Sequence, residues 1–190
     1  MSDKRPDIFE SGVNLERVIE LLTQGEIELL GRVLWSSNST FIAMVRDGEL
    51  ETPAVYKPAQ GEQPLWDFDA GTLCRREVAT YELSRDLGWP DIPPVVLREG
   101  PYGIGSVQLF VDADPEEHYF TLRYRPEFDV AFRRVALFDY AVNNADRKSG
   151  HLLQSSDGER IWCIDHGLTF HEEYKLRTVI WEYAGEPVEP

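Results

Sequence analysis

The spacing of hydrophobic and polar positions changes several times along the first 111 residues, and each change predicts a separate element. A helix is predicted at about Leu15–Leu22, and a longer amphipathic helix is predicted over Thr72–Leu87, just before Gly88. Short apolar runs between turn residues predict the strands Ile27–Trp35, Thr40–Arg46, Pro53–Pro58, Ile92–Leu97 and Gly105–Val111. This order predicts an N-terminal lobe of mostly antiparallel strands with one long helix.

The rest of the chain places two carboxylates at the ends of two apolar elements. An apolar helix that includes Phe138 delivers Asn144 and Asp146 into a loop. A short strand, the turn Ser155–Gly158 and a second strand then bring Asp165 back beside that loop. The sequence therefore predicts that Asp146 and Asp165 lie at one site.

Two carboxylates in this arrangement are typical of phosphoryl transfer. One orients the attacking hydroxyl and accepts its proton, while the other holds the divalent ion that neutralises charge on the transferred phosphate. An aspartate after a strand and shortly before a glycine is more often a turn or cap residue, so Asp165 alone is weak support. The order of further motifs along the chain is what favours a kinase.

A lysine and a glutamate stand upstream, in the order that a kinase requires. Lys57 lies on the short strand Pro53–Pro58 and would reach the phosphates of ATP. Glu77 lies in the middle of the predicted helix and would pair with Lys57, with Glu82 as the competing partner. A lone lysine at a strand end is ordinarily a solvated surface charge, so the prediction for Lys57 depends on this context.

Two other segments complete the predicted nucleotide cleft. The turn Ser36–Ser39 would cover the phosphates through backbone N–H groups and hydroxyls, although it has no glycine-rich fingerprint and an ordinary hairpin loop fits it equally well. The strand Gly105–Val111 would pack against adenine, and its backbone from Leu109 to Val111 would hydrogen-bond the base. The residues expected around adenine are Gln108, Leu109, Phe110 and Val111.

These motifs give the chain a family resemblance. It resembles the phosphatidylinositol 3-/4-kinase-like branch of the protein-kinase-like fold, more closely the type II phosphatidylinositol 4-kinases and the HipA-like kinases. Within that branch it looks like a member of a bacterial phosphatidylinositol 3-/4-kinase-like family. The matching stretches are Ala54–Pro58, the helix around Glu77, Gly105–Val111, Asp139–Leu153 and Ile164–Phe170, of which the last two are specific.

The resemblance implies a fold and a set of roles. The fold would be α+β, protein-kinase-like and two-lobed, with an N-lobe at about 12–111 and a short C-lobe at about 128–184 that form a single kinase-like domain. Lys57 would bind ATP phosphates, Asp146 would be the catalytic aspartate, and Asp165 would bind the metal. Asn144 and Arg147 would shape the catalytic loop.

The chain departs from the family pattern in three places. The family usually has a metal-binding asparagine five residues after the catalytic aspartate, whereas this chain has His151, which favours manganese tolerance, a single metal or a different role. The cysteine-rich insert of the eukaryotic type II enzymes is missing between Lys57 and Glu77. The C-lobe is short, and Tyr174–Tyr183 is expected to supply one closing helix or strand.

Composition and charge limit the partners. A chain of 190 residues with 42% hydrophobic residues can fill the core of one domain. The net charge of −15 argues against nucleic acid as a partner and disfavours membrane binding, although the arginines Arg123, Arg125, Arg133 and Arg134 would steer an anionic substrate or balance nearby acids. The acidic stretch Asp112–Glu117 is expected to be a solvated loop. Two cysteines, Cys74 and Cys163, are expected to be reduced, buried thiols of a cytoplasmic protein.

The sequence thus predicts a kinase-like phosphotransferase that uses ATP with Mg²⁺ or Mn²⁺ and acts on a hydroxyl of an unidentified protein or small molecule. Nucleotidyl transfer remains open, because the same cleft would hold ATP in the reverse orientation. A catalytically weak pseudokinase or nucleotide-sensing module is the first alternative. A metal-dependent hydrolase built on His151, His166, His171 and Asp165 is the second, although no H-x-x-x-H or H-x-x-E-H spacing occurs.

Overall fold

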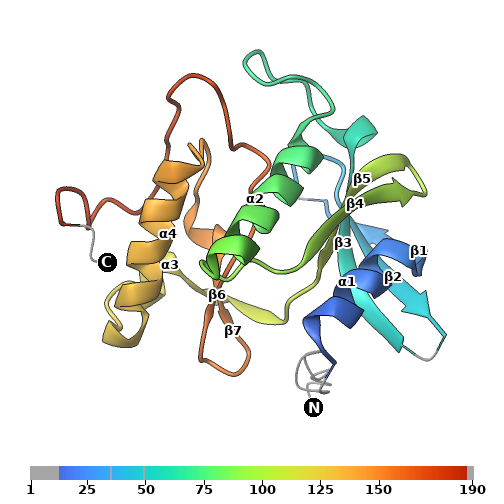
Figure 1. The fold of residues 1–190 in the computed structure, drawn as a ribbon, viewed down its shortest axis with the longest axis horizontal. Helices are drawn as coiled ribbons and strands as arrows, with labels where there is room; N and C mark the ends of the chain where they lie inside the picture. The colour runs from blue at the N-terminus through green and yellow to red at the C-terminus, as the bar shows by residue number, and fades with distance from the viewer. Residues whose placement is uncertain (1–12, 35, 49, 188–190) are drawn as a thin grey trace.

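The computed structural model describes residues 13–34, 36–48 and 50–187, which form two sheets with helices around them (Figure 1). The first part of the chain builds a five-stranded antiparallel sheet in the order β1-β2-β3-β5-β4. Its strands are β1 (Glu26–Arg32), β2 (Phe41–Asp47), β3 (Leu50–Pro58), β4 (Val95–Gly100) and β5 (Gly103–Leu109). A 3₁₀ turn, η1 (Ala59–Gly61), follows β3.

Helix α1 (Leu15–Gln24) packs on this sheet through one apolar face. It begins where the side chain of Asn14 accepts a hydrogen bond from the backbone N–H of Arg17. Val18, Leu21 and Leu22 are completely buried, and burial of each contributes about 1.5–3 kcal/mol to stability. The helix ends at Gly25, where a Cβ atom would lie 2.6 Å from Val45 Cγ1, so only glycine allows this close packing of helix end and strand.

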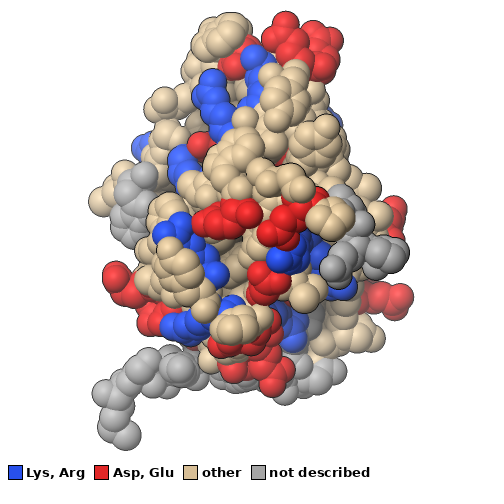
Figure 2. All heavy atoms as spheres, turned by 90° about the vertical axis from the view of Figure 1, so that its left-hand side faces the viewer, with Lys and Arg blue, Asp and Glu red and all other residues tan. Residues whose placement is uncertain are grey.

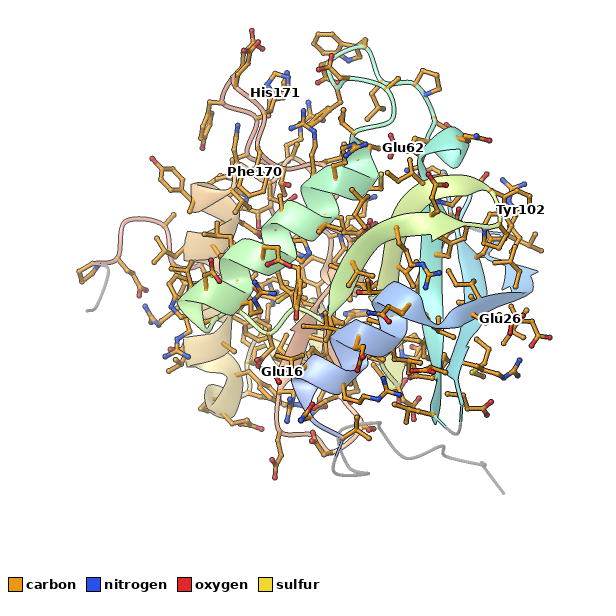
Figure 3. The ribbon with its side chains drawn as sticks, turned by 45° about the vertical axis from the view of Figure 1, so that its right-hand side comes forward. Glu16, Glu26, Glu62, Tyr102, Phe170 and His171 are labelled. Atoms are coloured by element: carbon orange, nitrogen blue, oxygen red, sulfur yellow. The ribbon has the colours of Figure 1, made fainter. Side chains whose placement is uncertain are left out.

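Helix α2 (Leu73–Leu87) crosses the middle of the molecule, between the five-stranded sheet and the helices of the second part (Figure 1). At its start the backbone N–H of Cys74 donates to the carboxylate of Glu62, which Figure 3 shows near this end of the helix. It ends at Gly88, whose φ of +74° is a left-handed cap. Because α2 contacts both parts, the side chains on its buried face can join them.

The second part combines helices with a small sheet. Its helical elements are α3 (Tyr119–Leu122), η2 (Pro126–Phe128), α4 (Asp129–Ala141) and η3 (Ser149–His151). Strands β6 (Ala113–His118), β7 (Leu152–Ser155) and β8 (Ile161–Cys163) form an antiparallel sheet in sequence order. A core of aromatic and aliphatic side chains, with Phe132 and Phe138 of α4 completely buried, joins these elements to α2. The α+β fold expected from the sequence is therefore present.

Several predicted boundaries need correction. The predicted strand Ile92–Leu97 begins only at Val95, because Pro93 and Pro94 have no backbone N–H to donate to a neighbouring strand. Strand β5 ends at Leu109 rather than Val111. The strand expected over Ile27–Trp35 ends at Arg32, and Trp35 lies outside the described residues.

Two larger predictions about the second part were wrong. The acidic stretch expected to be a solvated loop contains strand β6, which stays largely exposed because it lies at the edge of the small sheet. The closing helix or strand expected over Tyr174–Tyr183 does not form among the described residues; this segment is irregular apart from turns. The second part of the chain therefore combines short helices with a three-stranded sheet.

Candidate functional site

Lys57 and Glu77 form an ion pair between the sheet and α2. The Lys57 ammonium lies 2.6 Å from Glu77 Oε1, and the hydroxyl of Ser106 on β5 donates to Glu77 Oε2 over 3.0 Å. Glu77 is only 2% exposed, so its charge is satisfied by these two partners rather than by water. Glu82, the competing partner, pairs with Arg85 instead. The structure therefore brings together the lysine and glutamate that the sequence singled out.

Asp165 lies on the other side of the same ammonium. Its Oδ1 is 3.1 Å from Lys57 Nζ, and the backbone at Asp165 has a φ of +61°, which turns the chain sharply just after β8. Burial would lower the pKa of Lys57, but the carboxylates of Asp165 and Glu77 outweigh burial and raise it. Lys57 in turn is the main cause that holds the pKa of Asp165 below its usual range. Both groups are thus charged at neutral pH, and the Asp165 side chain is half exposed.

His151 faces the same carboxylate. Its Nε2 lies 3.4 Å from Asp165 Oδ2, and burial lowers the pKa of the imidazole to about 4. The ring is therefore neutral at physiological pH. Its Nδ1 accepts a long hydrogen bond from the backbone N–H of Lys148, 3.4 Å away, which places the ring proton on Nε2 and toward Asp165.

Asp146 lies in the loop that follows α4. Its backbone N–H donates to the side-chain oxygen of Asn144 over 3.0 Å, which fixes the direction of the loop. Its carboxylate is 36% exposed and lies 2.7 Å from the ammonium of Lys148. Lys148 was not among the predicted site residues, although its position two residues after the aspartate was a usable signal.

A buried ion pair between Arg147 and Asp139 holds this loop in place. The guanidinium of Arg147 donates to both carboxylate oxygens of Asp139 on α4, each over 2.9 Å, and both side chains are completely buried. The side-chain amide of Asn144 donates to the same carboxylate over 2.8 Å. Burial would lower the pKa of Arg147, but Asp139 outweighs it and raises the pKa. Arg147 and Asn144 thus shape the loop through Asp139, a residue that the sequence analysis did not assign to the site.

His166 extends this buried network. Its Nε2 accepts from Arg147 Nη2 over 2.7 Å, because a guanidinium can only donate. Burial and then the charge of Arg147 lower the pKa of His166, so the imidazole is neutral. The guanidinium also donates to the backbone carbonyl of Ile164, over 3.1 Å. Arg147 therefore ties the Asp146 loop to the segment that carries Asp165.

The segment after Asp165 returns to the same loop. The backbone N–H of Arg177 donates to the carbonyl of Asn144, and the carbonyl of Arg177 accepts from the N–H of Arg147, both over 2.9 Å. Asn143, with a φ of +53°, uses its side-chain amide to hold the carbonyls of His171 and Glu173. Figure 3 shows Phe170 and His171 near the N-terminal end of α2. This irregular segment is thus held by backbone hydrogen bonds instead of by a helix.

The strand that was expected to pack against adenine is present, but some of its backbone N–H groups already donate hydrogen bonds. The N–H of Leu109 donates to the carbonyl of Pro94 over 2.8 Å, and the N–H of Phe110 donates to the carbonyl of Pro53 over 3.1 Å. Within the described chain, the N–H of Val111 has no backbone partner. Gln108 is 4% exposed, and its side-chain amide nitrogen is buried with no partner in the described residues. If the backbone from Leu109 to Val111 binds a base, only its carbonyl groups and the N–H of Val111 can therefore take part.

The hairpin turn at Ser36–Ser39 is tied to the 3₁₀ turn that follows β3. The N–H of Ser39 donates to the carbonyl of Gly61 over 2.8 Å, and the side chain of Asn38 accepts from the N–H of Gln63 over 2.8 Å. The hydroxyl of Ser36 hydrogen-bonds that of Thr40. These hydrogen bonds hold the turn next to the 3₁₀ turn that follows the strand of Lys57.

The histidines do not gather into one metal site. His166 binds Arg147, and His171 contacts the backbone carbonyl of Asp67 over 2.6 Å, so each has a separate role. Across residues 13–34, 36–48 and 50–187, no group of three or more His, Cys, Asp or Glu side chains is arranged to hold a metal ion. Asp165 offers carboxylate oxygens, and His151 would offer Nε2 only with its ring proton on Nδ1, so a divalent ion there would need oxygens from a bound phosphate as well.

The charged surface is mixed in sign. Figure 2 shows Lys and Arg side chains next to Asp and Glu side chains over the face that α4 and the C-terminal segment occupy. Of the predicted arginine cluster, Arg123 pairs with Glu182, Arg125 with Glu117, and Arg133 with Asp129. These arginines therefore balance nearby acids. In the described part of the chain, no helix has the length and hydrophobicity needed to cross a membrane.

Comparison with known proteins gives sequence relatives. No protein-family model matches the chain. Protein Rv2133c of Mycobacterium tuberculosis (strain ATCC 25618 / H37Rv) is 40% identical over 202 aligned residues, which cover 89% of this chain and 72% of that protein. Phosphatidylinositol 4-kinase gamma 4 of Oryza sativa subsp. japonica is 32% identical over 60% of this chain and 23% of its own length. Phosphatidylinositol 4-kinase gamma 3 of Arabidopsis thaliana is 25% identical over 81% of this chain, which spans 33% of that enzyme.

Two solved kinase structures are also similar. The proinflammatory kinase CtkA of Helicobacter pylori has a TM-score of 0.49 at 11% identity, over 78% of this chain and 59% of that chain. The PknI kinase domain of Mycobacterium tuberculosis has a TM-score of 0.46 at 15% identity, over 78% and 62% of the two chains.

Proposed function

We propose that this chain, which belongs to one family with protein Rv2133c and is similar in sequence to plant phosphatidylinositol 4-kinases gamma, transfers a phosphoryl group from ATP to a hydroxyl of a protein or small molecule. The observation that carries this proposal is the position of the Lys57 ammonium between Glu77 and Asp165. A lysine held by a helix glutamate beside a metal-binding aspartate is the arrangement that kinases need to bind ATP phosphates. The acceptor group in this proposal is a hydroxyl of an unidentified protein or small molecule.

The other site residues have roles in this proposal that their contacts support. Lys57 would bind phosphate oxygens, and buried Glu77 would keep its ammonium in place. Asp146 would accept the proton of the acceptor hydroxyl as the hydroxyl oxygen bonds to the γ-phosphorus and the bond to the ADP oxygen breaks. Lys148, now beside Asp146, would balance the charge on the transferred group. Adenine would lie against the strand that contains Gln108 and Leu109, near Phe110 and Val111.

Asp165 and His151 would hold the divalent ion, Mg²⁺ or Mn²⁺. Their donor atoms fit such an ion only together with phosphate oxygens, because the pair supplies too few ligands alone. The ion, when bound, supplies positive charge next to the transferred phosphate. To bind the ion through Nε2, the His151 ring would carry its proton on Nδ1, and this tautomer gives up the long hydrogen bond from the Lys148 amide.

Nucleotide binding can be tested directly through thermal stability. At a nucleotide concentration about 100 times its Kd, ATP with Mg²⁺ or Mn²⁺ should stabilise the parent protein by about 2.7 kcal/mol, which raises Tm by several degrees. Lys57→Ala and Asp165→Ala should each remove this increase, because they delete the phosphate-binding cation and the metal ligand. The measurement is Tm with and without nucleotide for each metal.

Glu51→Ala is the matched control, since Glu51 lies on the same strand β3 and is exposed beside Arg46. This variant should keep the parent's response to nucleotide. An unchanged Tm of the parent with both metals, or an undiminished response in Lys57→Ala, would end the proposal of an ATP site at Lys57.

The role of His151 predicts a change of metal preference. If its imidazole is a metal ligand, His151→Asn should improve magnesium-supported nucleotide binding or turnover relative to manganese, because an amide oxygen suits the harder ion. The measurement is the ratio of apparent Kd or turnover in the two metals. His171→Asn is the control, because His171 contacts Asp67 and not the site. An unchanged ratio would assign His151 to orienting Asp165 alone.

A nucleotide-binding module without catalysis is the second candidate. It is favoured by one observation, that each of the two carboxylates already pairs with a lysine, Asp146 with Lys148 and Asp165 with Lys57. The Lys148 ammonium lies beside the Asp146 carboxylate that would receive the acceptor proton, so transfer would require Lys148 to move away. Measured turnover of Asp146 variants separates this module from an enzyme.

A further inference from the structure

A cavity of about 290 Å³ lies behind helix α2 and is lined by residues other than Lys57, Asp146 and Asp165. It opens where the C-terminal end of α2 faces the start of α1, the segment Gly88–Pro94 and strand β8. Figure 3 shows the end of α2 near the start of α1, where Glu16 is labelled. The kinase chemistry proposed above does not use this cavity.

Two aromatic side chains form its walls, and an arginine guanidinium lies over each ring. Tyr81 of α2 is 3% exposed and Trp162 of β8 is 4% exposed. The guanidinium carbon of Arg85 lies 5.9 Å from the centre of the Tyr81 ring, and that of Arg160 lies 5.2 Å from the Trp162 ring. All four side chains line the cavity. The space therefore combines aromatic walls with two cations.

The polar atoms of both aromatic residues lack partners. The hydroxyl of Tyr81 and the indole N–H of Trp162 are buried and make no hydrogen bond to any residue that the structure describes. A buried donor without a partner is costly, so native proteins satisfy nearly all such groups. A ligand that brings a hydrogen-bond acceptor into the cavity would supply the missing partner after a small movement of either ring.

The two arginines differ in whether a carboxylate already pairs with their guanidinium. Arg85 pairs with Glu82 on the same helix. Arg160 makes no ion pair within the described ranges and lies over an aromatic face, although its charge, after the hydrogen bond from Ser155, helps to lower the pKa of Asp157. Asp91 is an acidic residue of the lining, and it is exposed. Arg160 is therefore the cation that remains available for an anionic ligand.

We propose that this cavity binds a small aromatic carboxylate with one ring or two fused rings. The ring would lie against Trp162 and Tyr81, and the carboxylate would pair with Arg160, for which a guanidinium has the matching planar geometry. The cavity volume is at the lower end of ligand pockets, which run from about 300 to 1,000 Å³. It suits a bicyclic acid and is too small for a nucleotide.

The test uses fluorine NMR of the intact protein labelled with 5-fluorotryptophan, with indole-3-carboxylate as the probe. The chain contains five tryptophans, and the resonance of Trp162 is assigned from the spectrum of Trp162→Phe. Indole-3-carboxylate should shift the Trp162 resonance in a saturable manner. Arg160→Gln should weaken the binding about tenfold or more, since a hydrogen-bonded charge pair is lost. The uncharged indole-3-carboxamide should bind correspondingly more weakly to the parent.

Internal controls make the result decisive. Trp66 is 90% exposed with the ammonium of Lys175 5.0 Å from its ring centre, so it reports binding of the probe to an exposed aromatic ring beside a cation. Arg134→Gln, at an exposed arginine on α4, should leave the affinity unchanged. Arg160 is exposed, so its substitution should not disturb folding even if Trp162→Phe does. The proposal is overturned if no resonance titrates, if Trp66 titrates with the same affinity as Trp162, or if Arg160→Gln binds like the parent.

Discussion

Asp146→Asn should lower turnover by about 10²–10⁴-fold while it leaves the affinity for ATP nearly unchanged. The reason is that an amide cannot accept the proton of the acceptor hydroxyl, an interaction that matters mainly in the transition state. In the proposed function the ground-state contacts of the nucleotide would lie at Lys57 and Asp165, whose ion pair this substitution leaves in place. Turnover is measured as autophosphorylation or ATP hydrolysis with γ-labelled ATP, and affinity as the nucleotide-induced increase in Tm.

Asp86→Asn is the matched control, because Asp86 is an exposed aspartate on α2 that lies beside Arg85. It should retain parent turnover. A parallel assay with α-labelled ATP detects nucleotidyl transfer if the cleft holds ATP in the reverse orientation. Equal residual rates in the parent and Asp146→Asn would reject catalysis and leave the nucleotide-binding module as the remaining function.

The largest effect on stability is expected from the buried ion pair of Asp139 and Arg147, next to the loop that carries Asp146. Asp139→Asn should lower the free energy of unfolding by about 3–5 kcal/mol, because it leaves the charge of Arg147 buried without a carboxylate. The loss is a large share of the stability of a typical domain, about 5–15 kcal/mol. The measurement is the midpoint of urea unfolding at neutral pH, with the slope checked for two-state behaviour.

Helix α4 supplies the control for this prediction. Asp129→Asn removes an exposed carboxylate that pairs with Arg133 at the start of the same helix, so its unfolding midpoint should remain close to that of the parent. The double variant Asp139→Leu with Arg147→Met should recover part of the lost stability, since apolar side chains replace both charges. A midpoint for Asp139→Asn equal to that of Asp129→Asn would contradict a stabilising role for the pair.

The parts of the fold that follow local patterns could be predicted from the sequence. The spacing of apolar positions located α2, and the turn Ser155–Gly158 located the β7–β8 hairpin. The order of Lys57, Glu77, Asp146 and Asp165 anticipated that two lobes would bring them to one place, and the structure places Lys57 in contact with both Glu77 and Asp165. The element predictions succeed because the required signal lies within a few residues of each element.

The parts that were missed depend on contacts between distant residues. In the sequence, nothing separates Asp139 from other polar helix residues. Only the structure shows that its buried carboxylate accepts hydrogen bonds from Arg147 and Asn144 and so holds the loop after α4. Strand β6 was missed because an acidic sequence has low strand propensity, yet pairing with β7 supplies its backbone partners. The irregular segment before Arg177 could not be predicted, since backbone hydrogen bonds to the catalytic loop hold it, and these leave no pattern in side-chain spacing.

Both cysteines of the chain are buried, free thiols, as the sequence predicted. Burial raises the pKa of Cys74 to about 11 and that of Cys163 to about 12. Only the thiolate reacts with alkylating reagents, and at neutral pH neither group forms it to a useful extent. A single cysteine introduced at an exposed position such as Trp66 or Tyr174 would therefore accept a maleimide dye or spin label without removal of the native thiols. Labels at these two positions would report the distance between the loop before α2 and the segment after Asp165, and so whether the two close over a bound nucleotide.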